Sequence, residues 1–296
     1  MQNIIIVLCM LVPVSLYSQD YEPLVLNSAH VRTLQSKIVE GMEYVLNIAL
    51  PYGYEDTSKT FEVVYLLDAY ETFGLDLQTY QQQFFFREVP PLILVGINYN
   101  IKGKSFYKGL QDYLYIRSRD FTPTSLSHEQ VIQKHGKNFA SYVNESGGIE
   151  KFYHFLQEEL FPFIESEYRA NPNDRGIFSY SLGGLFSTYV LFKYPSTFQR
   201  YFIGSPHLLW DDKVIFNYYD ESKLNALKKP IQIYLSSQEL EAKGLRDSWS
   251  HLKEFLEQHE HPNLLLQTEI LRGERHLTGI GFAHSRAFRR LYDNND

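Results

Sequence analysis

Residues 176–186 constrain the fold of this chain more than any other stretch of its sequence. An apolar run leads into Ser181, with a small residue two positions before it (Ser179) and another two positions after it (Gly183). This spacing is typical of a nucleophile elbow, in which a serine occupies a strained turn between a strand and a helix. Bulky flanking side chains would clash there with the crowded backbone. The sequence therefore predicts a strand ending near Ser179, a sharp turn at Ser181 and a helix from Leu182.

Elsewhere, apolar runs of strand length alternate with segments of helical periodicity. The other expected strands are residues 31–39, 44–50, 61–67, 91–97, 198–204, 230–235 and 264–271, and the expected helices are about 75–87, 148–168, 245–258 and a terminal one. The first two strands flank a turn and are typical of an antiparallel hairpin at a sheet edge. Nearly continuous apolar runs such as 61–67 are typical of strands buried on both faces. The pattern predicts one α/β domain, a mostly parallel sheet with helices on both faces.

Periodicity fades over residues 98–147, which are rich in Tyr, Lys, Arg, Ser and Thr. A structureless stretch of this length in a compact domain is usually functional. We therefore expect an excursion here, of the kind that forms a lid or a binding loop.

The first 18 residues have the features of a secretory signal peptide. An apolar run over residues 4–14 is followed by a small residue, Ser18, and then by a polar segment. We expect cleavage after Ser18, a single mature domain over 19–296, and an exported protein, periplasmic or secreted, of a bacterium. The run is too short to span a bilayer, and Cys9 lacks the small residue before it that a lipoprotein anchor needs. We therefore expect no stable membrane anchor.

Cys9 is the only cysteine, so the mature chain would contain none. This excludes a cysteine nucleophile, disulfides and cysteine-based metal sites. The formal net charge of −7 argues against a nucleic-acid partner.

Three chemically competent groups follow three of the expected strands, where ligands bind in parallel sheets. They occur in the order Ser181, an acid at Glu239 or Glu241, and His276. This is the chain order of nucleophile, acid and base in the α/β-hydrolase fold, which is the fold we expect. A serine hydroxyl needs a base to remove its proton, and a carboxylate holds the imidazole in the required tautomer. The spacing alone does not choose between the two glutamates, and Asp247 is a more distant candidate.

An oxyanion hole requires two backbone N–H groups directed at the developing charge. Leu182, the residue after the predicted nucleophile, would supply one of them at a helix N-terminus. The other is expected from the turn after the 61–67 strand, at Tyr70.

With these residues in place, the sequence resembles the esterase D-like branch of the α/β-hydrolases, a family that includes feruloyl, acetyl-xylan and ferric-enterobactin esterases. The resemblance rests on Tyr65-Leu-Leu-Asp68, Val95-Gly-Ile-Asn98, Arg119-Asp-Phe-Thr-Pro123, Gly147-Gly148, Glu158-Glu-Leu-Phe-Pro-Phe-Ile164, Ser181-Leu-Gly-Gly-Leu-Phe186, Ser205-Pro206 with Trp210, and Ser236-Ser-Gln-Glu-Leu-Glu241. The family's Gly-x-x-acid turn would place Glu241 as the acid. The chain departs from the family pattern at Ser179, Tyr180, Ala69 and Gln238.

The resemblance implies a serine carboxylic-ester hydrolase that acts through an acyl-enzyme on a small-molecule ester, without a metal or organic cofactor. A siderophore trilactone esterase is an alternative, because the excursion carries basic residues that suit an anionic substrate. A plant-polysaccharide ester is equally open, since Tyr113, Tyr115 or Trp210 could stack on a sugar or phenolic ring. A non-catalytic binding protein on a hydrolase scaffold is the third alternative. Substrate contacts are expected from Arg117, Arg119 and Trp210.

Overall fold

The computed structural model describes residues 28–101, 106–259 and 261–293. The predicted signal peptide lies outside the described residues, as do residues 102–105 of the predicted excursion, which include the basic residues Lys102 and Lys104. Among the helices that are described, none combines the length and the apolar character needed to cross a membrane.

A single eight-stranded sheet forms the centre of the molecule, in the order β1-β2-β4-β3-β5-β6-β7-β8. The strands are β1 Ala29–Gln35, β2 Glu43–Ala49, β3 Phe61–Leu66, β4 Leu92–Tyr99, β5 Ala170–Tyr180, β6 Arg200–Gly204, β7 Ile231–Gln238 and β8 Leu264–Leu271. β1 pairs antiparallel with β2, and β2 antiparallel with β4, whereas all other neighbours are parallel. The prediction of a mostly parallel sheet with an antiparallel hairpin at one edge is confirmed.

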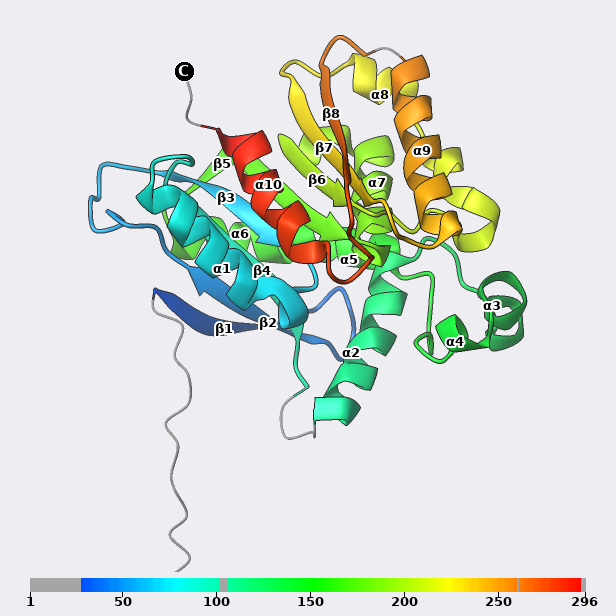
Figure 1. Cartoon of the computed structure of the whole chain (residues 1–296). Coiled ribbons are helices and arrows are strands. Elements are labelled where there is room, and N and C mark those ends of the chain that lie inside the picture. Colours follow the sequence, from blue (N-terminus) through cyan, green and yellow to red (C-terminus); the bar gives the residue numbers. More distant parts are fainter. Residues whose placement is uncertain (1–27, 102–105, 260, 294–296) are drawn as a thin grey trace, which may run out of the picture.

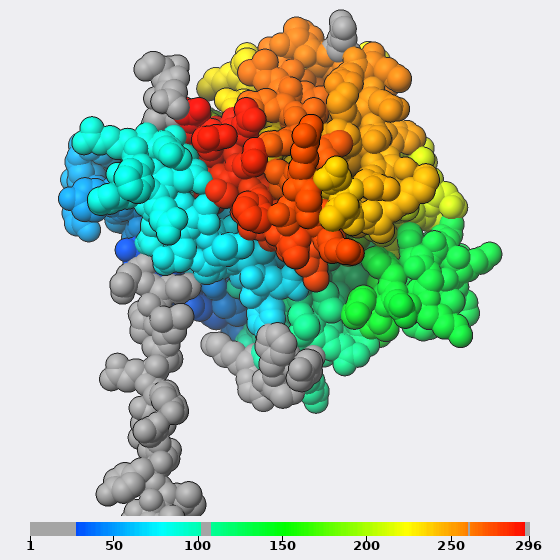
Figure 2. All heavy atoms as spheres, viewed as in Figure 1, coloured from blue at the N-terminus to red at the C-terminus, as the bar shows by residue number. Residues whose placement is uncertain are grey.

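Helices cover both faces of this sheet (Figure 1). They are α1 Ala69–Phe85, α2 Phe106–Phe121, α3 His128–His135, α4 Lys137–Ala140, α5 Ile149–Phe155, α6 Phe161–Glu167, α7 Leu182–Lys193, α8 Glu221–Asn225, α9 Lys243–Gln258 and α10 Ile280–Tyr292. A π-helical turn, Leu156–Leu160, joins α5 to α6, and 3₁₀ turns cover Pro195–Thr197 and Trp210–Tyr218. On one face α1 and α10 lie side by side, in cyan and red (Figure 2).

The two faces of the sheet carry separate apolar cores, because side chains alternate along each strand. One core includes Leu77, Phe178 and Phe288 and packs beneath α1 and α10. The other, larger core lies beneath α5, α6, α7 and α9 and includes Phe186 and Leu252. All residues of β4 are buried, as expected for a strand covered on both sides.

The expectation of a structureless excursion over residues 98–147 is wrong in one respect, because α2, α3 and α4 lie within it. Helix α2 buries Tyr113 and Phe121, which are separated by two helical turns. Arg117 stands midway between them on the same face of the helix. A charged residue at an inward-facing position interrupts the apolar periodicity from which a helix is recognised in sequence.

The carboxyl ends of the parallel strands bring distant parts of the chain to one edge of the sheet. Leu66 pairs with Phe178, Tyr180 with Gly204, and Gly204 with Ser236. Gln238 pairs in turn with Leu271 at the ends of β7 and β8. The turns that follow β3, β5, β6, β7 and β8 therefore converge, and those after β5, β7 and β8 contain Ser181, Glu241 and His276.

Candidate active site

Ser181 occupies a strained turn between β5 and α7. Its backbone has φ 56° and ψ −116°, a positive φ that is unusual for a residue with a side chain. Its N–H donates to the Gly204 carbonyl at 2.9 Å, and its own carbonyl accepts from the His207 N–H at 2.9 Å. These hydrogen bonds to the loop after β6 hold the turn in the geometry of a nucleophile elbow.

The small residues around Ser181 are needed because other parts of the chain approach closely. A Cβ on Gly184 would lie 3.0 Å from Pro206 Cα, and one on Gly183 would lie 3.2 Å from Asp68 Oδ2. Ser179 is fully buried and donates from Oγ to the Phe202 carbonyl at 2.7 Å. Serine fits at this position because its hydroxyl has a hydrogen-bond acceptor.

His276 and Glu241 are in direct contact. His276 Nδ1 lies 2.7 Å from Glu241 Oε1, and the carboxylate is fully buried whereas the imidazole is 28% exposed. The other carboxylate oxygen accepts from Ser237 Oγ at 2.9 Å and from the Gln238 N–H at 3.3 Å. Each oxygen of Glu241 therefore has a hydrogen-bond partner.

The pKa of Glu241 is lowered from its ordinary value, although burial acts to raise it. Hydrogen bonds from His276 and Ser237 favour the ionised form and outweigh burial. Glu241 is therefore an anion at neutral pH, the form that accepts a hydrogen bond from the imidazole Nδ1–H.

The other two acidic candidates lie elsewhere. Glu239 is exposed and accepts the Gly273 N–H at 2.8 Å. Asp247 is exposed on α9 and pairs with Lys243 at 2.6 Å. Of the three acids considered, the structure brings only Glu241 to His276.

Ser181 and His276 line the same pocket, with a volume of about 300 Å³. Its other lining residues are Asp68, Glu71, Thr72, Leu114, Arg117, Ser118, Phe139, Tyr142, Val143, Tyr180, Leu182, Leu277 and Ile280. The predicted excursion supplies part of this wall, including Phe139 and Tyr142. These aromatic residues could not be identified from the sequence, because their distance along the chain from Ser181 says nothing about contact.

The two predicted oxyanion donors lie at helix N-termini. Leu182 is the first residue of α7 and Tyr70 the second of α1, and backbone N–H groups in a first turn have no acceptor within their own helix. Leu182 lines the pocket. The described pocket wall includes Asp68 and Glu71 but not Tyr70, whose ring stacks on Tyr113 with centroids 5.2 Å apart.

The three predicted substrate-binding residues have different positions. Arg117 lines the pocket and forms an ion pair with Asp68. Arg119 lies outside the described pocket wall and pairs with Asp120 at 2.6 Å. Trp210 is fully buried and donates from Nε1 to Thr124 Oγ1 at 3.0 Å, so its ring offers no free face to a substrate.

A hydrogen-bond network behind His276 was not anticipated from the sequence. The Tyr180 hydroxyl donates to the His276 carbonyl at 2.6 Å, and Ser205 Oγ donates to the Tyr180 oxygen at 3.2 Å. Ser205 Oγ also contacts the amide of Gln238, which is fully buried. Gln238 replaces the glycine of the family pattern, and its side chain packs next to Ser205.

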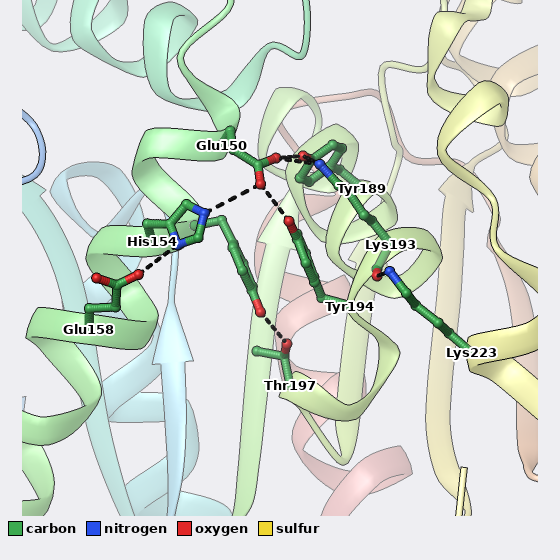
Figure 3. A network of polar contacts seen from close by, with 9 residues as sticks. Glu150, His154, Glu158, Tyr189, Lys193, Tyr194, Thr197 and Lys223 are labelled. Atoms are coloured by element: carbon green, nitrogen blue, oxygen red, sulfur yellow. Dashed lines mark hydrogen bonds and ion pairs between the residues drawn. The ribbon is translucent and has the colours of Figure 1, made fainter. Parts of the chain in front are cut away.

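A second polar cluster lies between α5 and α7 (Figure 3). Glu150 accepts from Lys193 Nζ at 2.7 Å and also from the Tyr194 hydroxyl. Lys193 and Tyr194 line a pocket of about 740 Å³ at the amino ends of β5 and β7. This pocket is larger than the one at Ser181 but lies at the opposite edge of the sheet. Because Lys193 on α7 pairs with Glu150 on α5, we interpret this cluster as a structural contact between the two helices.

The described residues contain no group of three or more His, Cys, Asp or Glu side chains placed to hold a metal ion.

Comparison with known proteins identifies the family of this chain. The model of the family described as "Putative esterase" matches residues 37–278, a range that contains Ser181, Glu241 and His276. The ferri-bacillibactin esterase BesA of Bacillus subtilis is 31% identical over 237 residues, which are 77% of this chain and 78% of that protein. The crystal structure of the BES protein from Bacillus cereus has a TM-score of 0.77 at 26% identity and covers 92% of this chain and 98% of that one.

A more distant solved structure shows the same fold. The siderophore hydrolase EstB from Aspergillus nidulans has a TM-score of 0.73 at 19% identity, over 93% of this chain and 98% of that one. The family match covers most of the described domain, and the solved structures share its fold. The chain belongs to this esterase family and is a carboxylic-ester hydrolase of the α/β-hydrolase fold.

Proposed function

We propose that the protein hydrolyses its ester through an acyl-enzyme formed on Ser181, with His276 as the general base and Glu241 as the acid that orients it. The observation that carries this proposal is the 2.7 Å contact between Glu241 and His276, because His276 lines the same pocket as Ser181. Because Glu241 accepts the Nδ1–H, the Nε2 atom of His276 is left as the basic nitrogen.

These positions support the following steps. Ser181 Oγ attacks the ester carbonyl while His276 Nε2 takes its proton, and Glu241 stabilises the resulting imidazolium. The tetrahedral intermediate collapses when His276 gives that proton to the leaving alcohol. Water then attacks the acyl-enzyme with His276 again as base, and the acid product leaves as Ser181 regains its proton.

Negative charge develops on the carbonyl oxygen in both halves of the reaction. The N–H groups of Leu182 and Tyr70 would stabilise it, and the positive end of the α7 dipole acts in the same direction. Removing a donor of this kind typically lowers kcat by about 10²–10³-fold.

For the substrate, we propose a lactone ester of a catecholate siderophore. Two relatives support this class, the ferri-bacillibactin esterase BesA and the siderophore enterobactin esterase of Emericella nidulans, the latter 26% identical over 179 residues. The wall formed by Phe139 and Tyr142 suits an aromatic ring, since aromatic pairs add to the energy of apolar burial. An exported location would place the enzyme where such a substrate enters the cell.

The catalytic proposal is tested by Ser181→Ala. The variant should fold normally and lose at least about 10³-fold in kcat/KM for p-nitrophenyl acetate. Ser187→Ala, which removes a buried hydroxyl from the same helix, is the matched control and should keep its activity. A fluorophosphonate probe should label the native protein on Ser181. Absence of labelling would favour a non-catalytic binding protein on this scaffold.

The substrate proposal is tested separately with native protein. A ferric catecholate trilactone should be hydrolysed with a kcat/KM at least about 10-fold above that of methyl ferulate, a difference worth about 1.4 kcal/mol. A preference for the feruloyl ester would reject the siderophore class and leave the Ser181 mechanism intact.

A further inference from the structure

Asp68 adopts an unfavourable backbone conformation at the start of α1. Its φ of 57° and ψ of 29° place it in the left-handed region, where a residue with a Cβ is disfavoured. An aspartate before the first turn of a helix ordinarily accepts a hydrogen bond from that turn. The Asp68 side chain makes no such bond, so the carboxylate is engaged elsewhere.

The partner of Asp68 is Arg117, in the middle of α2. Arg117 Nε donates to Oδ1 at 2.5 Å and Nη2 donates to Oδ2 at 2.7 Å, a two-pronged pair. The Tyr113 hydroxyl donates to the same Oδ1 at 2.6 Å. The side chains of Arg117 and Asp68 are only 14% and 7% exposed, so water screens this pair little.

Arg117 also contacts the nucleophile elbow. Its Nη2 donates to the carbonyl of Tyr180, the residue directly before Ser181, at 3.2 Å. Asp68 also approaches this elbow, since a Cβ on Gly183, in the first turn of α7, would lie 3.2 Å from Asp68 Oδ2. The ion pair thus connects the turn after β3 with the turn after β5.

We propose that Arg117 is a positioning residue that sets the separation of the two oxyanion donors, Tyr70 and Leu182. Tyr70 lies two residues after Asp68, and Leu182 lies two residues after Tyr180. Arg117 holds both turns through Asp68 and the Tyr180 carbonyl. This inference rests on the proposed function, because it assigns a role to the geometry of that site.

The same ion pair explains why Asp68 tolerates its backbone conformation. A planar guanidinium fixes a carboxylate in both position and orientation, which a lysine ammonium does not. Tyr113 adds a second constraint, since it bonds Asp68 through its hydroxyl and stacks on Tyr70 through its ring. The turn that contains Tyr70 is therefore held at a defined place before substrate binds, as electrostatic stabilisation of an oxyanion requires.

The test compares Arg117→Lys with Arg175→Lys. Arg175 makes a similar ion pair, with its Nε 2.9 Å from Glu165 Oε1 and its side chain 18% exposed, but it lines the pocket at the opposite edge of the sheet. Both variants should lose thermal stability by a similar amount. Only Arg117→Lys should lower kcat, by about 10²-fold, with KM changed less than about 3-fold. Acylation and deacylation should slow together, because both pass through an oxyanion.

A milder variant covers the case in which Arg117→Lys fails to fold. Tyr113→Phe removes one donor from Asp68 and should lower kcat by about 3- to 10-fold, also at nearly constant KM. Unchanged kcat in a folded Arg117→Lys or Tyr113→Phe variant would overturn the inference. An equal fall of kcat in Arg175→Lys would also overturn it. Labelling of Ser181 by a fluorophosphonate in native protein tests the proposed function separately. If Ser181 is labelled stoichiometrically while kcat is unchanged in these variants, only the inference about Arg117 fails.

Discussion

His276 Nδ1 lies 2.7 Å from Glu241 Oε1, whereas Glu239, two residues earlier, bonds the backbone N–H of Gly273. Both glutamates follow β7, which ends at Gln238, but Glu241 is buried whereas Glu239 is exposed.

We expect Glu241→Gln to lower kcat strongly, by up to about 10⁴-fold, because an amide in this place favours the wrong imidazole tautomer. Steady-state hydrolysis of p-nitrophenyl acetate measures the effect. Glu239→Gln is the control and should stay within about 2-fold of the native rate, as expected for an exposed carboxylate. The reverse pattern would assign the acid to Glu239.

Tyr180→Phe should leave the loop that contains His276 less firmly positioned. The variant loses the 2.6 Å hydrogen bond from the Tyr180 hydroxyl to the His276 carbonyl, which is worth about 1 kcal/mol. We expect kcat to fall by about 3- to 10-fold. Tyr201→Phe removes a buried hydroxyl that donates to the Pro195 carbonyl at 3.3 Å, and its kcat should not change. Equal kcat in the two variants would show that the Tyr180 hydroxyl does not position His276.

Acidification should destabilise the protein through His207. Burial, followed by the nearby charges of His135, His276 and Arg117, lowers the pKa of His207 to about 3. In the unfolded chain the pKa is near 6.5, so the unfolded state binds more protons between these values. Stability due to neutral His207 is therefore fully present above about pH 6.5 and is lost as the pH falls towards about 3.

His207→Phe should reduce this pH dependence, because phenylalanine can keep the stacking on Phe139, whose ring lies 5.0 Å away and nearly parallel. Urea unfolding at pH 7.5 and pH 5.0 measures the difference in the free energy of unfolding. The free energy of unfolding should fall more between pH 7.5 and pH 5.0 in the native protein than in the variant. An identical loss in both proteins would exclude His207 as its source.

The sequence predicts a mature N-terminus at Gln19, through cleavage of a signal peptide after Ser18. Intact-mass measurement of protein recovered from the periplasm or medium of an expressing bacterium checks this prediction. A mass that still includes Met1 in that fraction would contradict it.

Much of the fold could be predicted from local patterns. Continuous apolar runs identified β3 and β4 as buried strands, and the small residues around Ser181 identified the turn between β5 and α7. These features depend on neighbours within a few residues, since steric crowding and burial on both faces act locally. The helix α2 was missed because Arg117, a charged residue on its buried face, interrupts the apolar periodicity.

The sequence by itself determined the order of the strands, the strained serine turn and the positions of Ser181 and His276 after strand ends. The tertiary structure decided which acid meets His276, which aromatic residues line the pocket, and that Arg117 faces Asp68 whereas Trp210 is buried. The physical reason is the separation of the partners along the chain. Asp68 and Arg117 are 49 positions apart and Glu241 and His276 are 35 positions apart. Such contacts depend on how strands pair and helices pack, which no local pattern contains.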